Sequence, residues 1–195
     1  MTACRPLIFA LLCAASGAAA DPISGADANA MLFPEQGVSV ELIAHDKLSK
    51  SVMKIIKAVA EQQPWYAAVA LSPDEDLMTS PATVAGAQFH DTDAAAIFAL
   101  AGCEAKRTGE SPCAVVALVR PKGWEARDLQ LGLNATAFFT ATYEPAPAPK
   151  ALATSAATGA FGFGAGADAA LADCRSKGGA DAESAADDCV VVIAD

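Results

Sequence analysis

Apolar residues in the middle of the chain form short, uninterrupted runs of strand length. Residues 65–71 are one such run, and Pro73 marks a turn directly after it. Residues 113–119 form a second run, rich in β-branched side chains, which is typical of a buried strand. Between them, residues 82–89 are a weaker candidate strand, and residues 94–107 have the apolar spacing of a helix. The pattern predicts the order strand, strand, helix, strand.

The same order returns near the C-terminus in a shorter form. Residues 151–155 and 160–164 are short strands that we expect to pair as a hairpin around a glycine-containing turn. Residues 168–177 follow as a helix. Residues 190–193 form a β-branched run, which predicts the last strand.

The two halves also share short motifs. Ala-Leu-x-x-Cys occurs at residues 99–103 and again at residues 170–174, near the end of each predicted helix. Cys-x-Val-Val starts at Cys113 and again at Cys189, where each last strand begins. Because both motifs recur in the same order, we interpret the two halves as related units.

These elements predict an α+β fold class. Two related ββαβ units would form an antiparallel or mixed sheet with helices on one face, and an N-terminal helix would be added to it. The expected segments are a signal peptide (1–20), an N-terminal helical segment (21–64), a first repeat unit (65–120), a linker with an extra strand and a Pro-rich spacer (121–149) and a second repeat unit (150–195).

Outside the units, the pattern predicts one helix and one strand. Residues 47–62 have the periodicity of an amphipathic helix, which Pro64 ends. We expect this helix to pack against the sheet; the alternative is a helix that binds a partner or a membrane surface. In the linker, residues 137–143 resemble an extra strand, and the alternating prolines of residues 144–149 predict a stiff spacer.

The N-terminus has the three regions of a signal peptide. Arg5 precedes an apolar run at residues 7–15, and small residues follow up to Ala20. We therefore expect cleavage after Ala20 and a periplasmic or secreted protein. The apolar run is too short for a membrane anchor, and no later stretch is long and apolar enough to span a bilayer, so we expect no membrane span in the mature chain.

The composition bears on the size of the core, and the net charge bears on which partners the protein can bind. Hydrophobic residues make up 53% of the chain, but alanine supplies many of them and only 6% of residues are aromatic. Because alanine buries little apolar area, we expect a thin core. The formal net charge of -10 disfavours nucleic acid and anionic membrane surfaces as partners, since both are bound through basic residues.

Four cysteines remain once the signal peptide is removed, namely Cys103, Cys113, Cys174 and Cys189. An even number in an exported chain predicts two disulfides. In each unit one cysteine ends the helix and the next begins the last strand, so we favour bonds within the units, Cys103–Cys113 and Cys174–Cys189. Pairing between the units stays open, because Cα separations cannot be read from a sequence. No Cys-x-x-Cys spacing supports the alternative, a four-cysteine zinc site.

With these motifs the chain resembles a bacterial exported family, the domain of unknown function numbered 4189. The second unit carries the pattern most fully, with Leu152-Ala153-Thr154-Ser155, Thr158-Gly159-Ala160-Phe161-Gly162, Ala170-Leu171 with Cys174, and Cys189-Val190-Val191-Val192. The first unit matches only from Ala96 onward and lacks the Thr-Gly hairpin. The resemblance implies an exported, disulfide-bonded fold and implies no activity.

Two acidic stretches are weak candidates for calcium binding. Asp74 and Asp76 belong to the first stretch, and Asp181 and Glu183 belong to the second. Neither has the residue pattern of a calcium-binding loop, and acidic loops are usually solvated surface. We therefore expect no metal site.

His90 is the candidate for catalysis. A small secreted hydrolase could use it with a serine, Ser111 or Ser155, and with an aspartate. No Gly-x-Ser-x-Gly motif occurs in the chain, and Asp91 suits the start of a helix. We therefore expect no catalytic residue.

One glycine-rich motif bears on cofactors. Gly162-x-Gly164-x-x-Ala167 loosely matches a dinucleotide fingerprint, but the next strand is the last of the chain, so no nucleotide-binding domain can be completed. We expect no cofactor. The function most compatible with the sequence is a non-catalytic exported module that binds an envelope protein or a cell-wall component. The alternatives are a small hydrolase that uses His90 and an acidic calcium-binding module.

Overall fold

The computed structural model describes residues 21–178 and 186–195. The predicted signal peptide with its cleavage position, and the calcium candidates Asp181 and Glu183, lie outside these ranges. Along the chain the elements are α1 (Gly25–Met31), β1 (Val38–Leu42), α2 (Lys50–Ala60), β2 (Ala67–Leu71), β3 (Val84–Gly86), α3 (Thr92–Glu104), β4 (Ala114–Pro121), α4 (Leu133–Phe138), the π-helical turn η1 (Phe139–Tyr143), β5 (Ala151–Thr154), β6 (Phe161–Gly164), α5 (Ala167–Lys177) and β7 (Val190–Ala194).

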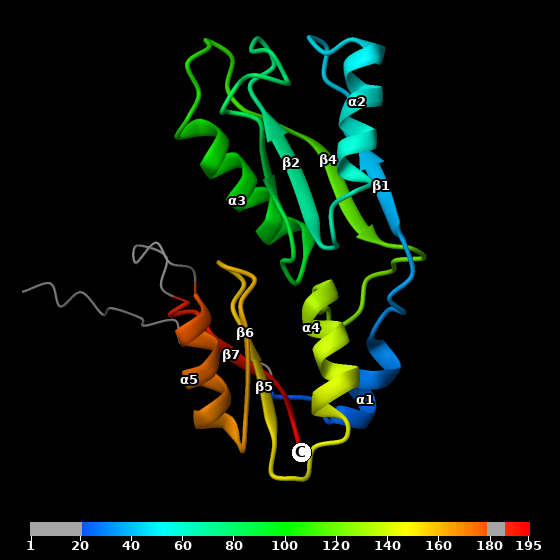
Figure 1. Cartoon of the computed structure of the whole chain (residues 1–195), viewed down its shortest axis with the longest axis vertical. Coiled ribbons are helices and arrows are strands. Elements are labelled where there is room, and N and C mark those ends of the chain that lie inside the picture. Colours follow the sequence, from blue (N-terminus) through cyan, green and yellow to red (C-terminus); the bar gives the residue numbers. More distant parts are fainter. Residues whose placement is uncertain (1–20, 179–185) are drawn as a thin grey trace, which may run out of the picture.

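The first unit is built on a four-stranded sheet with the order β1-β4-β2-β3, in which all neighbours are antiparallel (Figure 1). Successive residues of β2 point to opposite faces of this sheet. Val69 and Leu71 pack in the cluster that contains Ile56 of α2, whereas Ala68 and Ala70 pack in the cluster under α3. The helices α2 and α3 therefore cover opposite faces, and the predicted placement of the helices on one face is wrong.

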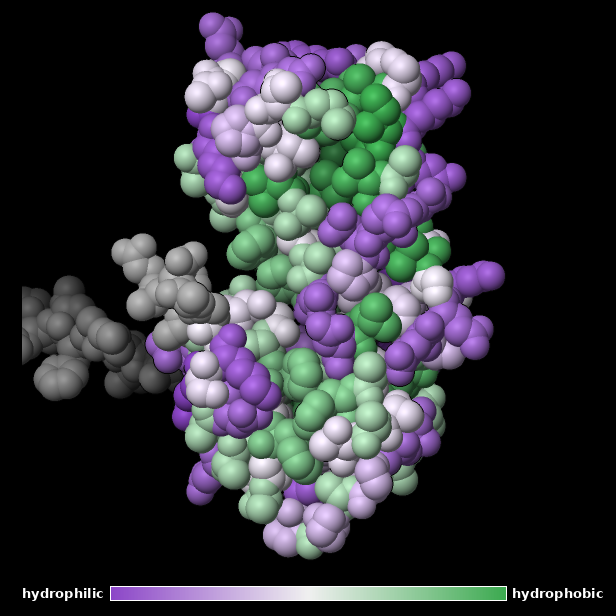
Figure 2. Space-filling view, viewed as in Figure 1, coloured by the Kyte–Doolittle hydropathy of each residue, from purple (hydrophilic) through white to green (hydrophobic). Residues whose placement is uncertain are grey.

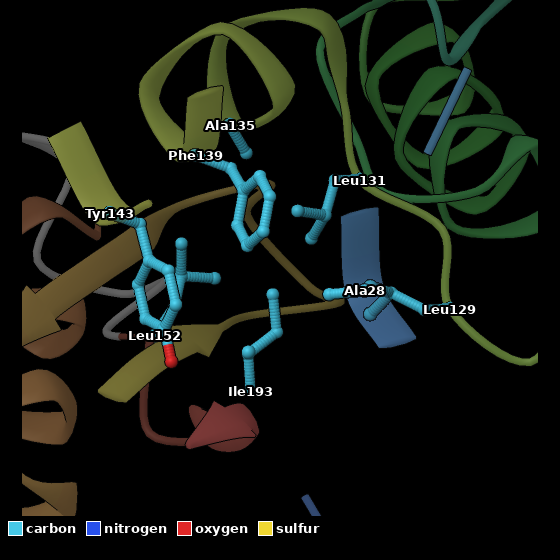
Figure 3. Close-up of a cluster of buried hydrophobic side chains, with 8 residues drawn as sticks. All are labelled: Ala28, Leu129, Leu131, Ala135, Phe139, Tyr143, Leu152 and Ile193. Atoms are coloured by element: carbon cyan, nitrogen blue, oxygen red, sulfur yellow. The ribbon is translucent and has the colours of Figure 1, made fainter. Parts of the chain in front are cut away.

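The second unit is built on a three-stranded antiparallel sheet with the order β6-β5-β7. Leu152 of β5 packs against Phe139 and Tyr143, together with Ala28 of α1 (Figure 3). Ala153, the next residue of β5, packs in the cluster of α5 and its disulfide. The α+β class is thus confirmed, with each unit forming its own antiparallel sheet.

The predicted extra strand at residues 137–143 is wrong, because these residues form the end of α4 and η1. Ala135, Phe139 and Tyr143 recur every fourth residue and are all buried, which places them on one face of a helix. Aromatic and β-branched residues suggested a strand, but packing against Leu152 overrides that preference. Like α2 before β2, this helix precedes the central strand β5 and covers the face opposite the disulfide-bonded helix.

The two units share a detail of strand register. The pairing of β2 with β4 shifts between Val69 and Ala70, and that of β5 with β7 shifts between Leu152 and Ala153. Each shift leaves out the third residue after the cysteine that precedes the last strand, Val116 or Val192. The irregularity therefore falls at the same place in both sheets.

In each unit, one disulfide connects the end of the helix to the start of the last strand. Cys103 bonds to Cys113 with Cα atoms 6.1 Å apart, and Cys174 bonds to Cys189 with Cα atoms 6.3 Å apart. The pairing within units is confirmed. In the chain-entropy picture each closed loop contributes about 3 kcal/mol to stability, which suits a core built largely of alanine.

The N-terminal segment contributes both a helix and an unpredicted strand. Helix α2 lies within the expected range 47–62 and starts where the Ser49 hydroxyl accepts a hydrogen bond from the Val52 N–H. The strand β1 pairs with β4 and becomes the outer strand of the first sheet. Its sequence, Val-Ser-Val-Glu-Leu, alternates as an edge strand does, so the signal for it was present.

Among the described residues, no helix combines the length and the apolar composition needed to cross a bilayer.

Candidate functional site

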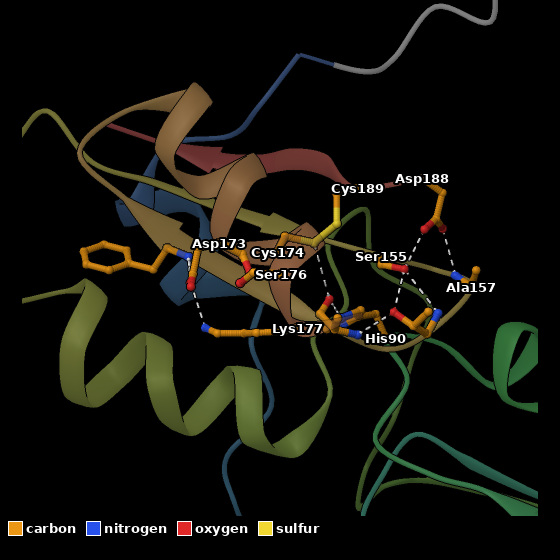
Figure 4. Close-up of a disulfide and its surroundings, with 12 residues drawn as sticks. His90, Ser155, Ala157, Asp173, Cys174, Ser176, Lys177, Asp188 and Cys189 are labelled. Atoms are coloured by element: carbon orange, nitrogen blue, oxygen red, sulfur yellow. Dashed lines mark hydrogen bonds and ion pairs between the residues drawn. A yellow bond between two sulfur atoms is a disulfide. The ribbon is translucent and has the colours of Figure 1, made fainter. Parts of the chain in front are cut away.

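His90 lies between β3 and α3, where the first unit meets the second, and it is only 7% exposed. Its Nδ1 accepts a hydrogen bond from the N–H of Gly132, just before α4, at 3.2 Å. Its Nε2 lies 3.2 Å from the carbonyl oxygen of Ala160, before β6 (Figure 4). Because a carbonyl oxygen can only accept a hydrogen bond, Nε2 carries a proton. Because Nδ1 itself accepts a hydrogen bond, it carries none, and the ring is therefore neutral. Burial lowers the pKa of His90, which keeps it neutral.

Neither candidate serine contacts His90 through a hydrogen bond of its hydroxyl. The Ser155 side chain is fully buried, and its hydroxyl donates to Asp188 at 2.6 Å while accepting from the N–H of Thr158 at 3.2 Å. The Ser111 hydroxyl accepts from the ammonium group of Lys47. Since His90 uses both ring nitrogens on backbone groups, the geometry is not that of a Ser-His-Asp triad.

Ser155 and Asp188 instead hold two loops together. Asp188 precedes Cys189, and its second carboxylate oxygen accepts the N–H of Ala157 in the turn between β5 and β6 at 2.8 Å. Desolvation works against the charged form of Asp188, but the hydrogen bonds from Ser155 and Ala157 outweigh it and lower the pKa of the carboxyl. The carboxylate therefore stays charged and joins the hairpin turn to the loop that carries the disulfide.

The calcium candidate Asp74 has the corresponding role in the first unit. Its carboxylate accepts the hydroxyl of Ser72 at 2.7 Å and the N–H groups of Glu110 and Ser111 at 3.0 Å each. The bond from Ser72, followed by that from the Ser111 N–H, lowers the pKa of Asp74 to about 2. Ser72 follows β2, an inner strand of the first sheet, and Ser155 follows β5, the central strand of the second. Both units therefore close this end with a buried serine and a carboxylate.

The other described calcium candidate is also occupied by hydrogen bonds. Asp76 accepts the hydroxyl of Thr79 at 2.8 Å and the N–H groups of Met78 and Thr79 at 3.1 and 3.0 Å. Within residues 21–178 and 186–195, no group of three or more His, Cys, Asp or Glu side chains is arranged to hold a metal ion. The carboxylates of Asp74 and Asp76 therefore stabilise the conformation of their loops.

A groove runs along β7 at the junction of the two units. It consists of two hollows, of about 240 and 520 Å³, which share Asp128, Leu129, Val190 and Val192 in their walls. We call it the junction groove. Its other lining residues are Asp21, Ile23, His90, Asp91, Gln130, Thr154, Ala156, Asp188 and Val191.

The junction groove combines an apolar wall with negative charge. Four aspartates line it, and the described lining residues include neither lysine nor arginine. Its strand β7 is an outer strand of the sheet. Among residues 21–178 and 186–195, only Ile23 pairs with its free side, through bonds to Val192 and Ala194. Val190, beyond that pairing, is 47% exposed. An outer strand of this kind can pair with an added peptide segment.

The sequence predicted part of this groove. The run at residues 190–193 indicated a strand, but nothing indicated that Asp128 and Leu129 of the linker would lie beside it. Hydrophobic patterning reports which residues are buried and does not report which segments meet.

A comparison of the chain with protein-family models, with curated proteins and with solved structures finds no match.

Proposed function

We propose that this chain is an exported, non-catalytic binding module of the bacterial cell envelope, and that the junction groove is its binding site. The observation that supports this most directly is the groove itself, in which the exposed Val190 and the half-buried Val191 and Val192 of an outer strand lie beside four aspartates. Such a site suits a segment of an envelope protein, or a cell-wall component, that presents positive charge next to apolar groups.

The two disulfides support the exported part of the proposal, because such bonds persist in oxidising compartments outside the cytoplasm. The same proposal includes three further points. They are the signal peptide, membership of family 4189 and descent of the two units from one repeat. The shared strand order and register shift of the two units support the repeat.

The geometry of His90 favours binding over hydrolysis. A general base needs a ring nitrogen within reach of the nucleophile, and both nitrogens of His90 are bonded to backbone groups between the units. The calcium alternative is weakened in the same way, since the carboxylates of Asp74 and Asp76 already accept N–H and O–H groups.

The test is thermal unfolding of oxidised residues 21–195 with soluble cell-wall fragments and with peptides that alternate basic and apolar residues. A ligand at one hundred times its dissociation constant adds about 2.7 kcal/mol. For a chain of this length, that raises the melting temperature by roughly 5–11 °C, at about 2–4 °C for each kcal/mol.

The variant Asp128→Asn should reduce this rise, because it removes an exposed charge from the groove without touching the core. Asp46→Asn, an exposed aspartate outside the junction groove, is the matched control and should respond as the unaltered chain does. The proposal fails if no member of the panel raises the melting temperature, or if the Asp128 variant responds fully.

A further inference from the structure

A second groove lies in the first unit, between the end of β1 and the first turns of α2. It has a volume of about 350 Å³, and we call it the α2 groove. Its lining residues are Leu42, Ala44, His45, Leu48, Lys50, Met53, Lys54 and Lys57. None of these residues lines the junction groove, so the two sites are separate.

The floor of the α2 groove is apolar because β1 is the outer strand of its sheet. Val38 and Val40 pack with the core under α2, and Leu42, which points to the same face, extends beyond that cover and is 36% exposed. Leu48 and Met53 are half-buried on the other side. Figure 2 shows apolar surface on the first unit, in the upper half of the view, with hydrophilic surface along the right-hand edge of that unit.

The rim of the α2 groove is positive although the whole chain has a formal net charge of -10. Lys50, Lys54 and Lys57 follow one another at helical spacing and so form one stripe along α2. Lys57 pairs with Glu61 at 3.6 Å, whereas Lys50 and Lys54 make no ion pair within the described ranges. No carboxylate is among the lining residues that the structure describes. The groove therefore presents unneutralised positive charge beside an apolar floor.

We propose that the α2 groove binds a free, single-chain amphiphile with an anionic headgroup, such as a long-chain alkyl carboxylate. The alkyl chain lies against Leu42, Leu48 and Met53, and the headgroup lies between Lys50 and Lys54. The volume falls within the range of small-molecule sites, which are mostly apolar with a few placed polar groups. The source is the free molecule and not a bilayer, because the net negative charge of the chain opposes approach to an anionic membrane.

The experiment is isothermal titration of oxidised residues 21–195 with dodecanoate below its micelle concentration. We expect one site per chain. The double variant Lys50→Gln with Lys54→Gln should weaken binding about tenfold, because two partly screened charge interactions are removed. Lys106→Gln with Lys122→Gln, two exposed lysines elsewhere, should leave the affinity unchanged. Leu42→Ala should weaken binding by loss of apolar contact, and circular dichroism should confirm that each variant is folded.

Two further titrations test the charge of the headgroup and the source of the amphiphile. Dodecyltrimethylammonium has the same chain with a positive headgroup, and it should not bind. Vesicles of phosphatidylglycerol should not bind either. Equal affinity for the two headgroups, an unchanged affinity in the Lys50 and Lys54 variant, or binding to vesicles without binding to dodecanoate would each overturn the proposal.

Discussion

At the scale of single residues, His90 shows how a side chain associated with catalysis can serve structure. It is one of two histidines in the chain and lies beside an aspartate in the sequence, a combination that suggests an acid–base group. In the fold it connects the loop after β3 to Gly132 and Ala160, and thereby joins the first unit to the second. Its role follows from burial between segments that are far apart in the sequence.

This placement makes the protein sensitive to mild acid. The pKa of His90 is lowered by burial, so below about pH 6.5 the unfolded chain takes up a proton that the folded chain does not. Stability should therefore fall as the pH drops from 7 to 5, by at most about 1.4 kcal/mol per pH unit. Urea unfolding at several pH values measures this slope.

The variant His90→Asn is the control for that slope, because its amide oxygen can still accept the Gly132 N–H but it does not titrate. The variant should be less stable at pH 7 and should lose the slope between pH 7 and 5. The carboxylates of Asp74 and Asp188 have lowered pKa values, so the stability they contribute is present above about pH 4 and is lost only below it. A slope that persists in the Asn variant would contradict this role of His90.

At the scale of elements, each unit has a glycine where its disulfide-bonded helix packs against the neighbouring outer strand. The glycine lies in the helix of the first unit and in the strand of the second. In the first unit, Val84 of β3 packs against Gly102, the residue before Cys103 in α3. In the second unit the corresponding strand residue is Gly162, and Asp173 precedes Cys174 in α5. Helix and strand can approach closely only if one of the two positions is glycine.

Alanine at these two glycines should therefore have unequal effects. At Gly162 a methyl group would overlap with the backbone nitrogen of Cys174 and the carbonyl oxygen of Ala170, and neither can move without shifting α5. Gly162→Ala should cost about 3 kcal/mol or more of unfolding free energy.

At Gly102 the added methyl meets only the Val84 side chain, at 3.1 Å, and alanine favours the helix. Gly102→Ala should stay within about 1 kcal/mol of the unaltered protein. Denaturant unfolding measures the free energy that each variant loses. Equal losses would show that Gly162 does not lie as close to α5 as described.

At the scale of the whole molecule, hydrogen bonds and packing, and not only the chain connection, hold the two units together. The N–H of Leu133 in α4 donates to the carbonyl oxygen of Trp65 at 3.0 Å, and His90 adds its two bonds nearby. One face of β5 is covered by α1, α4 and η1, all outside the predicted second unit. We therefore expect one cooperative unfolding transition.

Removal of one disulfide tests this cooperativity. Replacing Cys103 and Cys113 by alanine should cost about 2–5 kcal/mol. Because the units unfold together, hydrogen exchange should become faster in β5 as well as in β2. The reciprocal variant, with Cys174 and Cys189 replaced, should affect β2 in the same way. Exchange that changes only in the altered unit would show two independent domains.

Local patterning was sufficient for much of the fold. Short apolar or β-branched runs predicted β2, β4 and β7, and a glycine-containing turn predicted the hairpin of β5 and β6. The recurring Ala-Leu-x-x-Cys and Cys-x-Val-Val motifs predicted both disulfides. These predictions succeeded because strand and helix periodicity, and a cysteine at the end of each helix, are properties of neighbouring residues. The sequence by itself thus determined the order of elements within each unit.

Only the tertiary structure decided how distant segments meet. The helical state of residues 137–143 depends on burial of Phe139 and Tyr143 against Leu152, which no local preference reports. The junction groove and the structural role of His90 arise where the linker and the second unit close on the first. A pattern along the chain records that a residue is buried, whereas the neighbour that buries it is selected by long-range packing.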